Sequence, residues 1–213
     1  MTPGQPLPDD LAVPADHAAV AALDDKLGAA LERVGHALRA QLSQEARALE
    51  LSPIQAQLVL RLAHEPAQRR RVGVLAAELD VTPPTVSDAL AALRRKGLID
   101  AGAVEGDRRG RLLALSSEGE RVAGRLASWQ RPVADHLAGV APARKADALA
   151  LLLDLMGAMH DAGVINVART CPTCRFFRRD AAGGDPHRCA LLDSPLRLQD
   201  LRVDCAEHQP AAG

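Results

Sequence analysis

Aromatic residues are almost absent from this sequence of 213 residues. It contains one tryptophan, two phenylalanines and no tyrosine, about 1% of the chain. Leucine, alanine and valine must therefore supply the hydrophobic core. The same scarcity argues against a protein that stacks the bases of single-stranded nucleic acid on aromatic rings.

The sequence also lacks a long uninterrupted apolar run. The most apolar stretch, residues 146–159, contains Asp147 and Asp154 and is too short to cross a bilayer. No cationic start precedes an apolar segment at the N-terminus, so a secretory signal is not predicted. Four prolines before residue 15 indicate a flexible arm over residues 1–16. We therefore expect a cytoplasmic protein that has no membrane partner.

Residues 75–97 show the pattern of a helix-turn-helix. Leu75 and Leu79 are four residues apart, which predicts an apolar stripe on a short first helix. Thr82 is suited to cap a second helix, Pro83 fits its first position, and Gly97 is suited to end it. The predicted buried stripe of this second helix consists of Val86, Leu90 and Leu93.

A β-hairpin with a basic tip is predicted to follow. Residues 98–99 and 111–115 are typical of two strands joined by a polar turn that contains glycine. This segment carries Arg108, Arg109 and Arg111, and arginine suits phosphates and narrow grooves. Together these parts predict a winged helix-turn-helix, which places a helix in the major groove of DNA and a wing against the backbone or minor groove.

The outward side of the second helix carries short polar side chains. Thr85 and Ser87 can bond to bases or phosphates, and Asp88 can accept from a cytosine amino group or position an arginine. Arg94 lies in a basic run at the end of the same helix. No long bidentate donor lies at the centre of the helix, so we expect DNA shape to contribute much of the sequence preference.

The net charge of −1 does not by itself indicate a nucleic-acid-binding protein, but the basic residues are clustered. Any one basic run could be a solvated helix end or loop. Three runs around one helix-turn-helix pattern favour a surface that faces phosphates. The three runs are residues 69–71, 94–96 and 108–109.

The motifs in residues 75–119 resemble those of the MarR family of bacterial transcriptional regulators. The wing carries Asp107–Arg108–Arg109, and the segment Leu115–Gly119 follows with Ser116 where the family usually has threonine. An arginine frequent in the family after Gly-Leu-Ile is absent, since Asp100 and Ala101 stand there. The resemblance extends over residues 17–162. It implies a mainly α fold with a small β-hairpin wing, and a transcriptional regulator without catalytic residues, a repressor by family tendency.

Long helices are predicted on both sides of the helix-turn-helix. Leucines and valines three and four residues apart predict an amphipathic helix from His17 to about Ala48, and residues 52–55 form a capping-box start for the next helix. After the wing, Ser117 and Glu120 give a similar capping-box start, with Ser117 as the cap, to a helix that reaches about Val140 with a kink or break at Pro132. The last predicted helix covers residues 143–161 and is apolar almost all round.

A helix that is apolar on most sides must be covered on most sides. The resemblance implies that the first and last helices interlock with those of a second copy into a homodimer; packing within one subunit is the alternative. A two-fold dimer would place two recognition helices one DNA turn apart, so a pseudo-palindromic double-stranded operator is expected. Small-molecule effectors of some family members bind beside the dimer helices, where His36, Arg39 and Gln55 could line a cleft or serve only as surface residues.

All four cysteines lie after residue 170, within 35 residues of one another. Two are separated by two residues, and the others follow after gaps of fourteen and fifteen residues. Four thiolates in a reducing compartment suit zinc or an iron–sulfur cluster better than disulfides. Free buried thiols and a thioredoxin-type dithiol are the alternatives. The predicted metal ligands are Cys171, Cys174, Cys189 and Cys205.

An iron–sulfur cluster is favoured over zinc, because zinc modules often pair two Cys-x2-Cys knuckles and this tail has one. His187 and His208 lie near the last two cysteines and could complete a Cys3His zinc site, while Phe176 and Phe177 could shield the metal. We predict three regions: the arm 1–16, a winged-helix and dimerisation domain 17–162, and an irregular metal-binding tail 163–213. The competing functions are a small-ligand-gated regulator with a structural zinc tail, and an electron-transfer or thiol-redox protein on a winged-helix scaffold.

Overall fold

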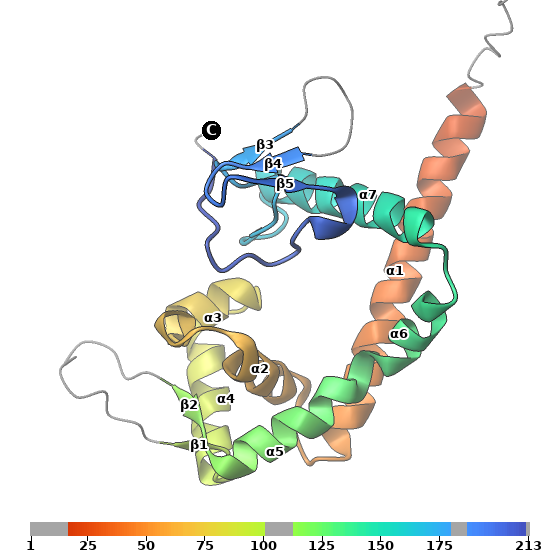
Figure 1. Cartoon of the computed structure of the whole chain (residues 1–213). Helices are drawn as coiled ribbons and strands as arrows, with labels where there is room; N and C mark the ends of the chain where they lie inside the picture. The colour runs from red at the N-terminus through yellow and green to blue at the C-terminus, as the bar shows by residue number, and fades with distance from the viewer. Residues whose placement is uncertain (1–16, 101–112, 180–186, 212–213) are drawn as a thin grey trace, which may run out of the picture. The chain divides into compact units, whose positions relative to one another are not determined.

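The computed structural model describes residues 17–100, 113–179 and 187–211 (Figure 1). The chain forms two compact units, residues 1–41 and 42–213. Helix α1 (His17–Arg47) makes up the described part of the first unit and continues into the second. Its bounds match the predicted helix from His17 to about Ala48. Leu23, Leu27, Leu31 and Val34 form an exposed apolar stripe along the first unit.

The centre of the second unit is a winged helix-turn-helix. It contains α2 (Pro53–His64), a 3-10 turn (Ala67–Arg69), α3 (Val72–Glu78), α4 (Pro83–Arg95) and α5 (Ser117–Leu126). Strand β1 (Ile99–Asp100) pairs antiparallel with β2 (Ala114–Leu115), with Ile99 opposite Leu115. The predicted mainly α fold with a small hairpin is therefore confirmed, while the hairpin tip lies outside the described residues.

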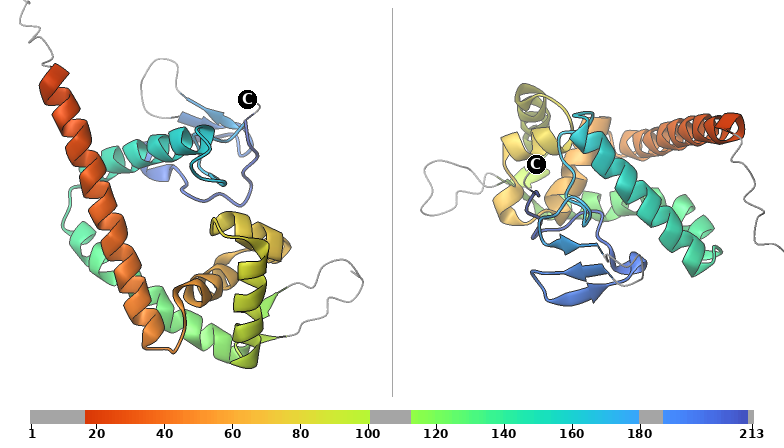
Figure 2. Two further views of the ribbon diagram at one scale, coloured as in Figure 1. Left: turned by 180° about the vertical axis from the view of Figure 1, so that it is seen from behind. Right: turned by 90° about the horizontal axis from the view of Figure 1, so that it is seen from above.

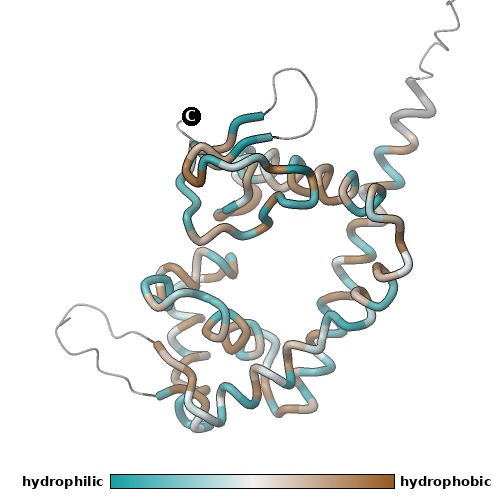
Figure 3. The backbone as a smooth tube through the Cα atoms, in the orientation of Figure 1, coloured by the Kyte–Doolittle hydropathy of each residue, from teal (hydrophilic) through white to brown (hydrophobic). Residues whose placement is uncertain are grey.

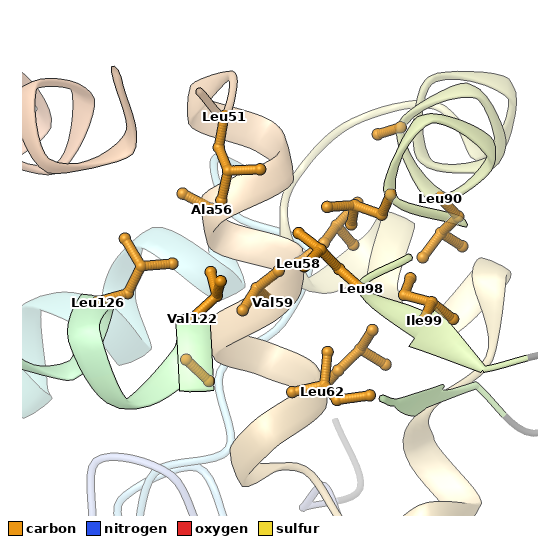
Figure 4. Close-up of a cluster of buried hydrophobic side chains, with 14 of the residues drawn as sticks. Leu51, Ala56, Leu58, Val59, Leu62, Leu90, Leu98, Ile99, Val122 and Leu126 are labelled. Atoms are coloured by element: carbon orange, nitrogen blue, oxygen red, sulfur yellow. The ribbon is translucent and has the colours of Figure 1, made fainter. Parts of the chain in front are cut away.

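Helix α2 is the centre of the hydrophobic core (Figure 4). Leu58 and Leu62 are fully buried, and Leu90 of α4 and Val122 of α5 belong to the same cluster. Figure 4 shows α2 between α5 on one side and α4 with β1 on the other. Aliphatic side chains dominate this core, as the scarcity of aromatic residues predicted.

The helix ends follow local hydrogen-bonding chemistry. Ser52 and Gln55 form the predicted capping box at the start of α2. The Thr82 hydroxyl accepts a hydrogen bond from the amide of Thr85, and Gly97 has a positive φ of 71° just after α4. The prediction for α5 was one residue off: the side chain of Ser116, not Ser117, caps this helix by accepting from the Gly119 amide at 3.0 Å.

The segment after α5 does not form one long helix. A 3-10 turn (Ala127–Gln130) separates α5 from α6 (Arg131–Ala138), and α7 (Pro142–Asp161) follows. The break therefore comes just before the predicted site, and Pro132 lies in the first turn of α6, where its missing amide hydrogen costs no helical bond. Helix α7 agrees with the predicted last helix.

The described part of the tail is mostly turns and loops, as predicted, but it also contains a small antiparallel sheet. Its strands are β3 (Phe177–Arg178), β4 (His187–Cys189) and β5 (Ser194–Leu196), in the order β3–β4–β5, and a 3-10 turn (Leu198–Asp200) follows. Strands of two or three residues are too short to show an alternating pattern. Figure 2 shows this sheet in two further views.

The tail also has a core of its own, which is shared with α7. Leu153 of α7 is fully buried and clusters with Cys171 and Leu201, and Phe177 and Leu196 pack against this cluster. The tail therefore covers one side of α7 within the same chain. Leu151, Leu152 and Leu155 of the same helix remain exposed.

Hydrophobic and hydrophilic stretches alternate along the helices rather than forming long apolar blocks (Figure 3). Across the part of the chain that the structure describes, no helix combines the length and hydrophobicity required to span a membrane.

Candidate nucleic-acid interface and cysteine pocket

Helix α4 presents the polar face that the sequence predicted. Val86, Ala89, Leu90 and Leu93 point into the core, whereas Thr85, Ser87, Asp88 and Arg94 are exposed. The Thr85 hydroxyl lies 2.9 Å from the Thr82 hydroxyl, so the cap of the helix also orients the first of these polar groups. This exposed face, at the start and middle of a well-capped helix, is available to a groove of DNA.

The base of the wing is held to the end of α4 by two residues whose role the sequence did not reveal. The hydroxyl of Ser116 donates to the carbonyl of Gly97 at 2.6 Å, and its amide donates to the carbonyl of Leu98 at 3.1 Å. Gly119 lies so close to the Leu98 carbonyl that a Cβ built there would be 2.1 Å from its oxygen. Ser116 and Gly119 of the Leu-Ser-Ser-Glu-Gly motif therefore fix the wing base against the helix-turn-helix.

The predicted wing contacts Arg108, Arg109 and Arg111 lie outside the described residues, so their role in DNA binding stays a prediction. Arg94 and Arg95 are exposed at the end of α4, as a phosphate-facing run requires.

Two residues of the first basic run, Arg69 and Arg70, make contacts within the protein. Arg69 is half-buried; its Nε donates to Glu65 Oε2 at 3.0 Å, and its guanidinium also pairs with Glu78. The Nε of Arg70 donates to the backbone carbonyl of Glu65 at 2.8 Å. These two arginines therefore hold α2 and α3 together, since nearby carboxylates and carbonyls occupy their donors.

Arg69 belongs to a larger charge cluster that includes the tail. Glu65 follows α2 directly and Glu78 ends α3. The side chain of each is only 6% exposed. The guanidinium of Arg169, itself 7% exposed, reaches both carboxylates: Nη2 donates to Glu65 Oε1 at 2.9 Å, and Nη1 pairs with Glu78. The charge cluster consists of Arg61, Arg69, Arg169, Glu65, Glu78 and Asp204.

Asp204 anchors Arg169 from the tail side. The Nε and Nη2 groups of Arg169 each donate to one carboxylate oxygen of Asp204 at 2.7 Å, which is a bidentate pair. Arg61 also reaches Asp204, at 3.3 Å. Sequence reasoning missed this cluster, because Arg169 is 104 positions from Glu65 and no local pattern marks it.

The four cysteines line one pocket of about 180 Å³ in the tail. All four are free thiols; Cys171 is buried and the other three are half-buried. Apolar side chains complete much of the wall, and Phe176 and Phe177 are among them, as the shielding role predicted for them requires. The structure therefore brings the four predicted ligands to one place.

Backbone and cationic donors surround the sulfur atoms. The amide of Arg202 donates to Cys171 Sγ at 3.2 Å, and its guanidinium donates to Cys205 Sγ at 3.6 Å. Burial raises the pKa of the Cys171 thiol, the Arg202 amide acts against this shift, and the nearby thiols of Cys205 and Cys189 raise the pKa further. A cation in the pocket would oppose both effects that raise the pKa, because it stabilises thiolates.

The two histidines considered as ligands point elsewhere. His208 Nε2 lies 3.0 Å from the Thr173 hydroxyl, and burial is the main cause that lowers the pKa of His208. The ring of His187 packs edge-on against Phe177, with 5.1 Å between centroids. Neither lines the cysteine pocket as described. In the described ranges, no three His, Cys, Asp or Glu side chains converge closely enough to hold a metal ion as they stand.

The structure contains a larger pocket of about 1010 Å³, lined by residues of α3, α7 and the tail. Arg169, His160 and His208 are among its lining residues, together with Glu78. The three residues considered for an effector cleft do not line it where the chain is described. The Gln55 side chain is instead used in the cap of α2, where its Oε1 accepts from the Ser52 amide.

Comparison with known proteins shows that part of this winged helix is similar to one family. The model of the MarR family matches residues 49–110, which include α2, α3, α4 and β1. The resemblance inferred from the motifs is therefore confirmed for this region. No significant relative was found among curated proteins.

Solved structures share the fold. Transcriptional regulator PA3341 has a TM-score of 0.55 at 25% identity, over 63% of this chain and 98% of its own. The MepR–DNA complex of Staphylococcus aureus has a TM-score of 0.53 at 19% identity, over 62% of this chain and 96% of its own. A putative MarR-family regulator of Listeria monocytogenes, complexed with a 26-mer DNA, has a TM-score of 0.54 at 20% identity, over 62% of this chain and 87% of its own. More than a third of this chain has no counterpart in these three matches.

Proposed function

We propose that this chain, which matches the model of the MarR family over residues 49–110, is a transcriptional regulator that binds a pseudo-palindromic site on double-stranded DNA. The observation that carries the proposal is the exposed polar face of α4. Ser87, Asp88 and Arg94 line this face, while the opposite face is fully packed. The sharing of the fold with regulators solved in complex with DNA supports the same conclusion. Repression is the direction that the family resemblance favours.

The proposed active form is a homodimer. Leu151, Leu152 and Leu155 of α7 are exposed, and Leu23, Leu27 and Leu31 of α1 form a second apolar stripe. Exposed leucines at helical spacing on two long helices favour burial against a second copy. A two-fold arrangement would present two α4 helices to successive major-groove segments.

DNA binding is tested by selection from a random duplex pool, followed by fluorescence anisotropy with the selected site. Arg94→Ala should weaken binding and reduce the salt slope by about one unit, because one phosphate contact is lost. The matched control is Arg131→Ala, an exposed arginine at the start of α6, which should leave both quantities unchanged. Failure to enrich any two-fold symmetric sequence would contradict the proposal.

We further propose that the cysteine pocket holds an iron–sulfur cluster or zinc. The donor set fits by its chemistry, since four soft sulfur ligands line one small pocket with few competing donors. The side chains would have to draw closer together than they lie here. A cluster would supply a redox-responsive centre, whereas zinc would supply a structural one; the widely spaced third and fourth cysteines favour the cluster.

A visible absorption spectrum of anaerobically purified protein, with elemental analysis, distinguishes the two metals. A broad visible band with iron and sulfide indicates a cluster, and colourless protein with one zinc per chain indicates the structural alternative. Absence of both metals at near one site per chain would refute the metal proposal. A reversible dithiol that cycles without metal would instead favour the thiol-redox alternative.

A further inference from the structure

We propose that the cysteine pocket controls the helix-turn-helix through Arg169, so that loading of the metal site holds α3 and the turn before α4 in place. This inference rests on the proposed metal site. It extends that proposal by assigning a regulatory path and a positioning residue, neither of which is part of the winged-helix motif.

The path begins at two of the cysteines. Cys171 comes two residues after Arg169, and Cys205 directly follows Asp204. The two segments are joined by backbone hydrogen bonds: the Cys205 amide donates to the Arg169 carbonyl at 3.0 Å, and the Cys171 amide donates to the Arg202 carbonyl at 3.1 Å. A metal bound by Cys171 and Cys205 would therefore link the two segments that carry Arg169 and Asp204.

The path continues into the helix-turn-helix through buried carboxylates. Glu65 and Glu78 lie at the ends of α2 and α3, and each is paired with Arg169. Burial of a charged carboxylate is unfavourable unless cations or hydrogen-bond donors contact it, so loss of one such partner strongly destabilises the fold around it. Asp204 keeps the Arg169 guanidinium aimed at these carboxylates by its bidentate pair. The position of the tail is therefore coupled to the position of α3.

A second contact lies at the helix-turn-helix turn itself. The side-chain amide of Asn166 donates to the carboxylate of Asp80, which lies between α3 and α4 and has a positive φ of 52°. Asn166 belongs to the segment that leads from α7 to the first cysteine. The same stretch of tail therefore contacts both the end of α3 and the turn that sets the start of α4.

Loss of the metal should loosen both contacts together. Helix α3 has only seven residues, so it depends on packing and on these ion pairs for its order. Without a metal, the segments around Cys171 and Cys205 lose one of their links, so the pair between Arg169 and Asp204 is held less firmly. We expect α3 to open more often and the affinity for DNA to fall, since α4 is placed against α3.

The test is hydrogen exchange of the full-length protein, measured by mass spectrometry on peptides covering residues 72–96, with bound metal and after chelation under reducing conditions. Wild type should exchange about tenfold faster in α3 after chelation, a size typical of coupling between two sites, and should bind the selected DNA more weakly by a similar factor. Arg169→Gln should still bind metal but should lose this response to chelation.

Two further variants keep the test decisive if Arg169→Gln does not fold. Asp204→Asn leaves Arg169 and both buried carboxylates in place and weakens only the pairs that Asp204 makes with Arg169 and Arg61, so it should reduce the response. The matched control is Arg179→Gln, which removes an exposed tail-to-α7 pair with Asp154 and should keep the full response.

The outcomes separate this inference from the proposals on which it rests. The coupling through Arg169 is refuted if metal binds but hydrogen exchange in α3 does not change on chelation. It is also refuted if exchange in Asp204→Asn and Arg169→Gln increases on chelation as much as in wild type. In both cases the metal-site proposal is unaffected. If neither zinc nor iron binds, the metal proposal fails and this inference fails with it, whereas DNA binding by α4 is unaffected.

Discussion

Replacement of Gly119 by alanine should destabilise the winged helix, although alanine is the better helix former. Gly119 lies in the first turn of α5, and an added Cβ would lie 2.1 Å from the carbonyl oxygen of Leu98 and 3.1 Å from the Cβ of Leu115. Real Cβ atoms essentially never approach another heavy atom closer than 3.0 Å. The Leu98 oxygen is backbone and already accepts from the Ser116 amide, so the helix or the wing base must shift.

The magnitude follows from two opposing effects. Overpacking of a well-packed site costs about 1–3 kcal/mol, and alanine gains at most about 1 kcal/mol over glycine inside a helix. Because the clashing atom is backbone, the cost should lie near the upper end, about 3 kcal/mol, so we expect the free energy of unfolding to fall by about 2 kcal/mol. A urea m-value of about 2 kcal/mol/M converts this to a midpoint lower by about 1 M. The same shift should weaken DNA binding, because it displaces the end of α4.

The assay is urea unfolding followed by far-ultraviolet circular dichroism at one protein concentration. Gly124→Ala in the same helix is the matched control: its Cβ would meet nothing within 4 Å and the site is exposed. This control should raise stability by about 0.5–1 kcal/mol. If Gly119→Ala raised the midpoint as Gly124→Ala does, the close approach to Leu98 would be refuted.

Three further outcomes are expected. Arg109→Ala in the wing should weaken binding to all DNA sequences and flatten the salt dependence by about one unit of slope; unchanged affinity and slope by anisotropy would mean that this side chain does not contact DNA. Leu152→Glu should dissociate or unfold the dimer in light-scattering measurements, because it buries a charge in the proposed interface, whereas Val164→Glu just beyond α7 should remain dimeric; a well-folded Leu152→Glu dimer would place α7 outside the interface. Cys189→Ser should lower metal content as severely as Cys171→Ser and should increase proteolysis after about residue 164 while sparing the winged helix; full metal content in either variant would remove that cysteine from the ligand set.

The parts of the fold that could be predicted are those fixed by local chemistry. Thr82 with Pro83 marks the start of α4, and Gly97 marks its end, because capping and positive φ depend on the residue and its immediate neighbours. The exposed face of α4 followed from helical periodicity alone. The four cysteines could be grouped because thiols within one short tail, with none elsewhere in the chain, can reach a common centre through short loops.

The parts that could not be predicted depend on contacts between distant residues. Ser116 and Ser117 are both plausible caps, and only the approach of the Gly97 carbonyl decides between them. Strands β3 and β4 are too short for a pattern, and their pairing, which sets Phe177 opposite Cys189, depends on the fold of the whole tail. No feature of the sequence distinguishes Arg169 from a surface arginine, and only the fold buries it beside the carboxylates of Glu65 and Glu78.

The covering of α7 by the tail has a consequence for solubility. Leu149 and Leu153 face the tail, while Leu151 and Leu155 lie nearly opposite on the same helix, since successive residues are rotated by about 100°. A protein shortened to end after α7 would therefore expose leucines on both sides of that helix at once. Such a fragment should aggregate even where its winged helix folds, because the tail that covers Leu149 and Leu153 in the intact chain would be missing.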